Sequence, residues 1–69
     1  MPIVFAPKNV DLKVIRILTD EKTKKHLESL GFVPGATVSV ISAIAGNVIV
    51  NVKESRIAIS EEMGRKIYV

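Results

Sequence analysis

The segment from Gly31 to Gly35 limits what this chain can fold into more than any other part of it, because a helix has to end there. A glycine just past a helical stripe can take the left-handed conformation that closes the last turn, and Phe32 can then pack back against the helix. Pro34 cannot continue a helix, and its fixed φ suits the second position of a turn in which Gly35 takes a positive φ. The sequence therefore predicts a fixed corner between a helix and a strand.

A helix is predicted immediately before this corner. Thr19 or Asp20 provides an N-terminal cap, and the acidic first turn suits the positive end of the helix dipole. The helix should run to about Leu30. Thr23 and Leu27 join Leu30 in an inward stripe, whereas the charged residues between them form a solvated outer face.

The residues on both sides of the helix alternate with a period of two, which is typical of pleated strands. In the first strand, Leu12 and Val14 share a face with Arg16, so a bulge or burial on both sides is expected. Ala45–Asn47 turns the chain within a valine-rich hairpin, and Ser60–Met63 is interpreted as a capped 3-10 turn. The predicted strands are 12–18, about 36–43, 48–53, 56–59 and 66–69.

A membrane span is the alternative for the middle of the chain. No charged residue lies between Glu28 and Lys53, and a membrane helix requires about 20 apolar residues. Proline and glycine interrupt this stretch, however, and the period of two between the interruptions belongs to strands. We therefore expect strands and no membrane helix.

Five short strands with one helix inserted after the first can hide their edges only by curling into a small closed sheet. We therefore predict a mainly β fold, a small SH3-like five-stranded barrel with one inserted α-helix and a short 3-10 turn. Residues 12–69 would form this single domain, and residues 1–11 would form an N-terminal arm that covers a barrel end or stays loose.

Size and composition favour a binding module over an enzyme. A chain of 69 residues buries only about 60% of the surface that its unfolded form exposes, which leaves little stability for an active-site cleft. Without cysteine there is no disulfide and no thiolate metal site, and a reducing cytosol is the natural compartment. The first apolar run is too short for a secretory signal. The scattered net charge of +3 favours an acidic partner or an anionic surface.

The polar residues form no catalytic or metal-binding constellation. Glu61 and Glu62 are adjacent, so on a helix they point about 100° apart and cannot flank one substrate bond. His26 is the only histidine and has no cysteine beside it to complete a metal site, so it is interpreted as a solvent-flanking helix residue. We expect no cofactor, no bound metal and no catalysed reaction.

The corner is the candidate protein-binding surface. Phe32 is interpreted first as a core side chain. If Phe32 and Val33 are instead exposed, an apolar patch ringed by lysines would suit docking on another protein. The residues of this candidate surface are Lys24, Lys25, Leu30, Phe32, Val33 and Lys53.

Nucleic acid is the competing partner for the basic helix. Lys22, Lys24 and Lys25 could contact phosphates. Sites for single strands also interleave aromatic side chains on which bases stack, and the chain has only one tyrosine and two phenylalanines. Nucleic-acid binding is therefore not expected.

The corner Leu30-Gly31-Phe32-Val33-Pro34-Gly35, the valine hairpin and the closing Ile67-Tyr68-Val69 resemble the FeoA family, the small cytosolic partner of the bacterial ferrous iron transport system. The resemblance runs from about Leu12 to the end of the chain. Two departures from the family pattern are Ala45–Asn47, in a loop that often carries Gly-Asp-Pro, and Gly64, where a small helix former such as alanine is usual.

The resemblance implies a non-enzymatic cytosolic accessory protein that binds the membrane GTPase permease of that system and modulates it, and that meets the membrane only through this partner. The alternative is a stand-alone regulatory or nucleic-acid-binding barrel, because a similar domain ends the iron-dependent repressors of the diphtheria-toxin-repressor type. A metal carrier ranks lowest for want of ligands. A homo-oligomer stays open, because the sequence does not say which strand edge is free.

Overall fold

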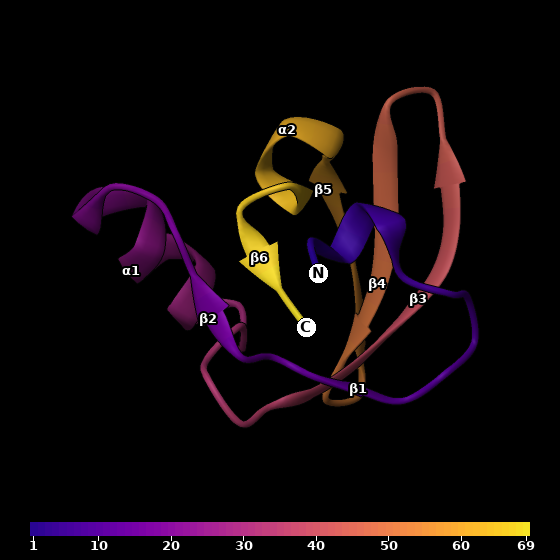
Figure 1. Ribbon diagram of the computed structural model, residues 1–69, viewed down its shortest axis with the longest axis horizontal. Coiled ribbons are helices and arrows are strands. Elements are labelled where there is room, and N and C mark those ends of the chain that lie inside the picture. The colour runs from indigo at the N-terminus through magenta and orange to yellow at the C-terminus, as the bar shows by residue number, and fades with distance from the viewer.

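Six strands form two antiparallel sheets in the computed structural model, which describes residues 1–69 (Figure 1). The elements in chain order are the 3-10 turn η1 (Ile3–Phe5), β1 (Leu12–Lys13), β2 (Arg16–Ile17), α1 (Glu21–Ser29), β3 (Thr37–Ile44), β4 (Asn47–Val52), β5 (Ser55–Ser60), α2 (Glu61–Gly64) and β6 (Ile67–Tyr68). The larger sheet has the strand order β1-β3-β4-β5, and the smaller sheet pairs β2 with β6.

The segment predicted as one strand, residues 12–18, is two short strands that belong to different sheets. β1 pairs with β3, and β2 pairs with β6. Between them Val14 N–H donates to Ala36 O and Ile15 N–H donates to Tyr68 O. The prediction of a single strand is therefore wrong, because the chain passes from one sheet to the other at these two residues. The mainly β, SH3-like class is confirmed, although the split gives six strands and the two sheets do not close into one ladder.

The remaining elements lie close to their predicted positions. β3, β4 and β5 each differ from the predicted limits by one residue at each end. α1 begins after Asp20, whose Oδ2 accepts a hydrogen bond of 3.1 Å from Thr23 N–H, so the predicted cap is confirmed. The turn predicted as 3-10 is the short α2, in which Met63 N–H donates to Ser60 Oγ at 3.1 Å. No helix has the length and the apolar character that crossing a membrane would need.

Valines of the β3–β4 hairpin form the centre of the core. Val38 and Val40 on β3 and Val48, Val50 and Val52 on β4 are at most 4% exposed, because alternate side chains of a strand face the same side. Burying each valine stabilises the fold by about 1.5 kcal/mol or more. The other buried hydrophobic residues are Ile3, Val14, Ile17, Leu27, Phe32, Ile59 and Ile67.

Residues 1–11, the predicted arm, lie against the sheets. Met1 and Val69 exchange two backbone hydrogen bonds of 2.9 and 2.8 Å. The side chain of Ile3 has no exposed surface and belongs to the core. The boundary at residue 11 stays a prediction.

The turn η1 packs directly on α2, and Gly64 makes this contact possible. A Cβ at position 64 would lie 2.6 Å from Val4 Cγ1 and 3.4 Å from Ile3 Cγ2. The first of these distances is far shorter than a van der Waals contact between carbon atoms, which is about 3.5–4.0 Å. A side chain at this position would therefore displace η1.

Candidate functional site

Helix α1 ends in the pair of hydrogen bonds known as a Schellman motif. Phe32 N–H donates to Leu27 O at 3.0 Å, and Gly31 N–H donates to Glu28 O at 3.0 Å. Gly31 has a φ of 106°, a conformation that favours glycine. A Cβ on Gly31 would also lie 2.7 Å from Val52 Cγ1. The predicted helix stop at Gly31 is confirmed, and the close approach of β4 gives it a second cause.

A tight turn follows at once and directs the chain into β3. Ala36 N–H donates to Val33 O at 2.9 Å, with Pro34 and Gly35 at the two central positions. The φ of Gly35 is 90°, as a type II turn requires. Gly35 N–H also donates to Val14 O at 2.8 Å. The corner is therefore tied to the segment that links the two sheets.

Phe32 lies inside the molecule and offers no surface to a partner. Its side chain is 0% exposed and is the largest of the fully buried ones. It shares the core cluster with Leu27, which is also fully buried. Phe32 is therefore a core side chain, as the first of the two interpretations predicted.

Three of the candidate residues lie at or beside the corner and keep part of their surface exposed. Val33 is 37% exposed, Leu30 is half-buried and Lys53 is exposed. The methylenes of Lys53 lie beside Gly31, because a Cβ built there would be 3.5 Å from Lys53 Cε. Lys53 has a φ of 56° in the turn between β4 and β5. We call Leu30, Val33 and Lys53 the corner surface.

The two helix lysines lie apart from this corner surface. Helix geometry places Lys25 about 160° around the axis from the buried Leu27, and Lys25 is exposed. Lys24 and Leu30 come three residues before and after Leu27, so they lie on opposite flanks of it. The structure therefore separates the basic helix face from the apolar corner instead of joining them.

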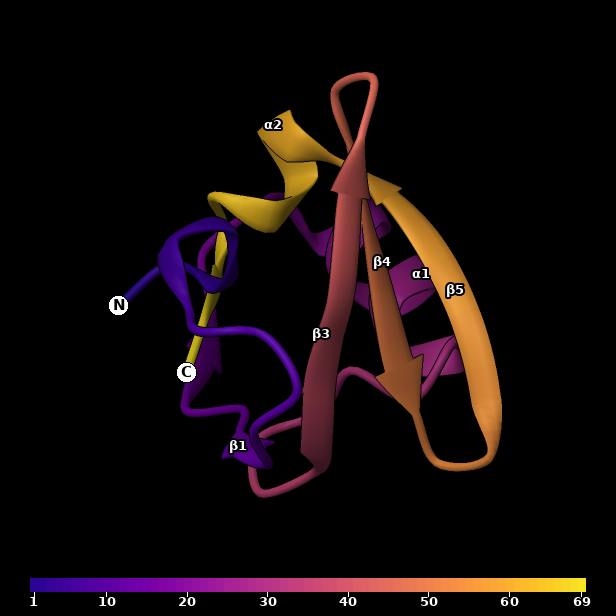
Figure 2. The same cartoon turned by 90° about the vertical axis from the view of Figure 1, so that its right-hand side faces the viewer.

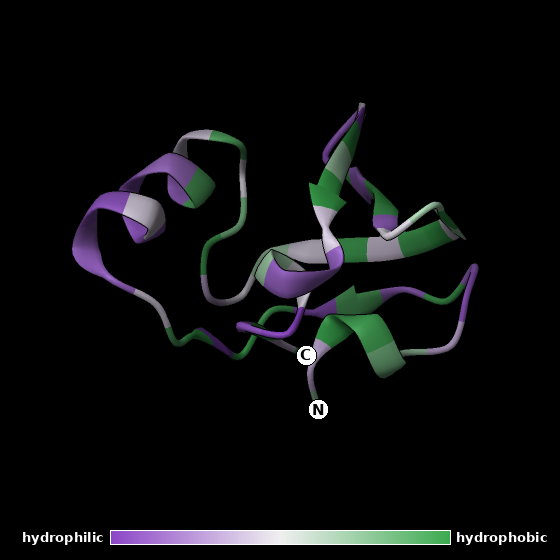
Figure 3. Ribbon diagram, turned by 90° about the horizontal axis from the view of Figure 1, so that it is seen from above, coloured by the Kyte–Doolittle hydropathy of each residue, from purple (hydrophilic) through white to green (hydrophobic).

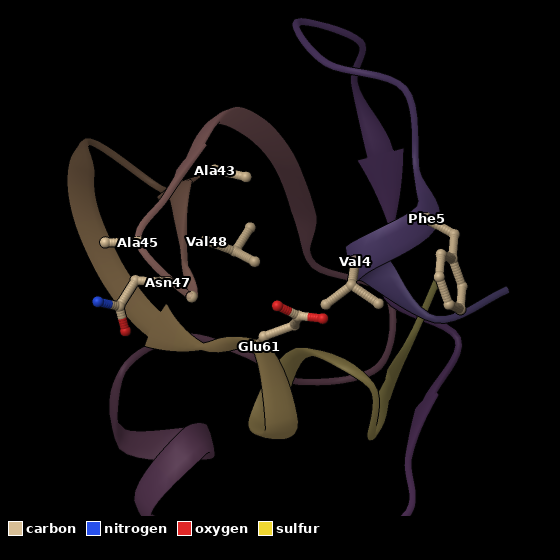
Figure 4. Close-up of a pocket in the computed structure, with 8 residues that line it drawn as sticks. Val4, Phe5, Ala43, Ala45, Asn47, Val48 and Glu61 are labelled. Carbon is tan, nitrogen blue, oxygen red and sulfur yellow. The ribbon is translucent and has the colours of Figure 1, made fainter.

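A pocket of about 260 Å³ lies between η1, the tip of the β3–β4 hairpin and α2 (Figure 4). Its lining is mostly apolar and includes Phe5. The carboxylate of Glu61 lies between Val4 and Val48 in Figure 4. Glu61 N–H donates to Gly46 O at 2.9 Å, which fixes α2 against the hairpin tip. The pocket combines an apolar wall with one acidic group.

Sequence reasoning missed this pocket because three distant parts of the chain build it. Residues 4–5, 43, 45–48 and 61 line it, and no local pattern shows that they come together. The register of β4 with β5, which pairs Asn47 with Ser60, brings α2 to the hairpin tip. Only the pairing of strands, which the sequence does not specify, reveals the pocket.

The charged residues of the molecule are exposed or half-buried, and most of them form no ion pair. One ion pair joins Arg65 Nη2 to Glu61 Oε1 at 2.9 Å, and no polar or charged side chain is buried. The Arg16 guanidinium lies over the Tyr68 ring, 5.2 Å from its centroid. No group of three or more His, Cys, Asp or Glu side chains gathers where it could hold a metal ion.

The chain resembles known proteins over its whole length. Residues 1–69 match the family model described as the FeoA domain. The crystal structure of an iron uptake regulatory protein (FeoA) is 28% identical and has a TM-score of 0.86, with 97% of this chain and 91% of that chain covered. Among curated proteins, none is similar in sequence to this chain.

Two solution structures share the fold. The FeoA protein from Chlorobium tepidum has a TM-score of 0.89 at 17% identity, with 99% of this chain and 67% of that chain covered. Iron(II) transport protein A from Clostridium thermocellum has a TM-score of 0.88 at 18% identity. The alignment covers 99% of this chain and 43% of that one.

Proposed function

This chain belongs to the FeoA domain family over residues 1–69, and from this we propose that it is a cytoplasmic accessory protein of ferrous iron uptake that binds the membrane GTPase permease of that system and modulates it. Family membership supports a role in ferrous iron transport. The proposal gives the chain no reaction of its own, and it places the protein at the membrane only through the permease.

The observation that carries the proposal is the corner surface. Val33 and Leu30 present apolar area on a backbone that the Schellman motif and the type II turn hold in one conformation. Lys53 adds a positive charge beside them. A rigid apolar contact with one charge at its rim loses little conformational freedom on binding, which is a property of good docking surfaces.

Co-purification with the permease tests this proposal. Val33→Asp puts a carboxylate into the apolar part of the corner surface, so the recovered complex should fall by about tenfold or more, because the carboxylate must lose its water when the complex forms. Lys53→Glu should give a smaller loss, since it reverses a charge at the rim.

Val10→Asp is the matched control. Val10 is 45% exposed and lies in the loop between η1 and β1, so the same chemical change falls outside the corner surface. Circular dichroism should show both variants folded. Equal recovery of the folded Val33→Asp and Val10→Asp proteins would contradict docking through the corner.

The aromatic residues argue against nucleic-acid binding as a second function. Phe32 is fully buried, and Tyr68 is half-buried with the Arg16 guanidinium over its ring. Phe5, at 69% exposed, is the one aromatic ring free to stack on a base. Sites for single strands use successive aromatic rings, and this surface does not provide them.

A further inference from the structure

The pocket beside Glu61 lies at the opposite end of β3 from the corner surface. β3 begins at Thr37, just after the corner, and ends at Ile44 in the hairpin tip. Figure 2 shows this tip and α2 at the top of the molecule and the start of β3 at the bottom. The pocket is therefore separate from the surface through which we propose that the permease docks.

The size of the pocket limits what can enter it. Its volume is about 260 Å³. Small-molecule and cofactor sites typically have volumes of roughly 300–1,000 Å³. The pocket is thus too small to enclose an ordinary cofactor, and it suits a single side chain that another protein inserts.

The walls of the pocket are held in place by contacts within the chain. Glu61 N–H donates to Gly46 O at 2.9 Å, which joins α2 to the hairpin tip. On the other side, the missing Cβ of Gly64 lets Val4 lie against α2. Walls that are already formed need no ordering when a side chain enters, so little binding free energy is lost.

The carboxylate of Glu61 determines which side chain the pocket suits. In Figure 4 this carboxylate lies between the side chains of Val4 and Val48. Its Oε1 accepts a hydrogen bond of 2.9 Å from Arg65 Nη2, and no group of the chain donates to Oε2. A purely apolar side chain would displace water from Oε2 without replacing its hydrogen bonds, which is unfavourable. The occupant must therefore bring a donor, and a positively charged donor bonds most strongly.

The ion pair with Arg65 leaves the carboxylate available to a second cation. The side chains of Arg65 and Glu61 keep 61% and 50% of their surfaces exposed. Water screens an exposed pair of this kind, so the pair is weak. It also uses only one of the two carboxylate oxygens. Arg65 therefore does not exclude a basic side chain of a partner.

The rest of the lining suits the stem of a long basic side chain. Val4, Ala43 and Val48 provide apolar surface, on which the methylenes of lysine or arginine pack well. Phe5 also lines the pocket and is 69% exposed. An aromatic face attracts a nearby cation. The pocket thus offers contacts to both parts of such a side chain, the apolar stem and the charged head.

We propose that this pocket binds the side chain of a lysine or arginine from a partner protein. The stem packs on Val4 and Val48, and the charged head bonds to Oε2 of Glu61. The chain as a whole has a net charge of +3, which does not favour a basic partner. Recognition therefore depends on this one carboxylate and its apolar surroundings.

NMR titration of the isotope-labelled chain with two capped tripeptides tests the proposal. One is acetyl-Gly-Lys-Gly-amide. The other has norleucine in place of lysine, so it keeps the stem and lacks the ammonium group. The lysine peptide should cause saturable shifts at the amides that line the pocket, with a Kd of about 1–10 mM. The norleucine peptide should bind about fivefold more weakly or worse, because it leaves the carboxylate without a donor.

Three variants separate the carboxylate from other causes. Glu61→Gln keeps the shape and removes the charge, so the Kd of the lysine peptide should rise by about fivefold or more. Glu62→Gln makes the same change in net charge at an exposed residue outside the pocket, so it should bind like the wild type. Arg65→Gln breaks the same ion pair but keeps the carboxylate, so it should bind at least as tightly as the wild type.

Three results would overturn the proposal. The first is a lysine peptide that causes no saturable shifts in the pocket at any concentration up to about 50 mM. The second is a norleucine peptide that binds as tightly as the lysine peptide. The third is a loss of binding in Glu62→Gln or Arg65→Gln as large as the loss in Glu61→Gln. None of these measurements involves the permease, so their failure would leave the function proposed above untouched.

Discussion

The larger sheet and helix α1 are held in place by very different amounts of packing. In β4, Val48, Val50 and Val52 are all at most 4% exposed, whereas α1 has Leu27 as its only buried residue. Figure 3 shows α1 as a mostly hydrophilic ribbon set apart from the strands. The sheet is a core element, and the helix is attached to it at one side.

This difference shows that stability and the positioning of a surface come from separate parts of a small fold. A helix of nine residues is too short to be stable alone in water. The position of α1 therefore depends on Leu27, on the Asp20 cap and on the Schellman motif at Gly31. The corner surface lies where this lightly held helix meets the well-packed sheet.

Phe32→Ala should give the largest loss of stability, about 3–5 kcal/mol in the free energy of unfolding, because it empties the core where helix and sheet meet. Urea denaturation measures this change. Val33→Ala in the same corner should stay within about 0.5 kcal/mol of the wild type, since Val33 is partly exposed. A Phe32→Ala chain nearly as stable as the wild type would show that the stability of the fold does not depend on the packing of Phe32 between the helix and the sheet.

Leu27→Ala should cost about 2–4 kcal/mol and should act mainly on the helix. Amide hydrogen exchange followed by NMR distinguishes the two regions. The α1 amides should lose protection far more than those of β4, because local opening needs only the Leu27 contact to fail. Equal loss in both regions would mean that the helix and the sheet unfold as one unit.

Two glycine substitutions separate backbone strain from crowding at the corner. Both Gly31 and Gly35 have positive φ, but a Cβ on Gly35 meets nothing within 4 Å, whereas one on Gly31 meets Val52. Gly35→Ala should cost about 1 kcal/mol from strain alone, and Gly31→Ala should cost about 2 kcal/mol or more. Thermal unfolding of the two variants side by side measures the difference, and equal costs would remove crowding by β4 as a cause.

The smallest effect is a pH dependence confined to α1. Hydrogen bonding from the side chain and then the backbone N–H of Thr23 lowers the pKa of Asp20 below its ordinary 3.8. A lowered pKa in the folded state stabilises the helix above that ordinary value, and the contribution is lost as the pH falls from the ordinary value through the lowered pKa of the folded state. Exchange of the α1 amides should therefore speed up on acidification relative to β4. Asp20→Asn, which still caps the helix, should remove this pH dependence.

Local chemistry explains which parts of this fold could be predicted from the sequence. Gly31, Pro34 and Gly35 each restrict the backbone at one position, and the structure has the helix stop and the type II turn that they indicate. Alternation within the valine hairpin likewise predicted strand limits that differ from those of β3 and β4 by one residue at each end. These signals act within a few residues, so they can be interpreted without knowing the fold.

The features that the sequence did not reveal depend on partners far along the chain. The apolar run around Val14 and Ile15 indicates a strand but not that the backbones of these two residues bond to different segments, so the split between the sheets was missed. The burial of Ile3 and the pocket beside Glu61 depend on which strands pair. For the candidate site, exposure was the deciding unknown, since nothing in the sequence separates a buried Phe32 from an exposed Val33.

Gly64 of α2 determines how closely η1 approaches this helix. Because Val4 occupies the place where a β-carbon of Gly64 would be, the first turn lies flush against α2, and both elements form walls of the same cavity. A methyl group at position 64 would therefore displace Val4, which lines this cavity. The absence of a β-carbon at position 64 thus sets how closely two walls of the cavity approach each other.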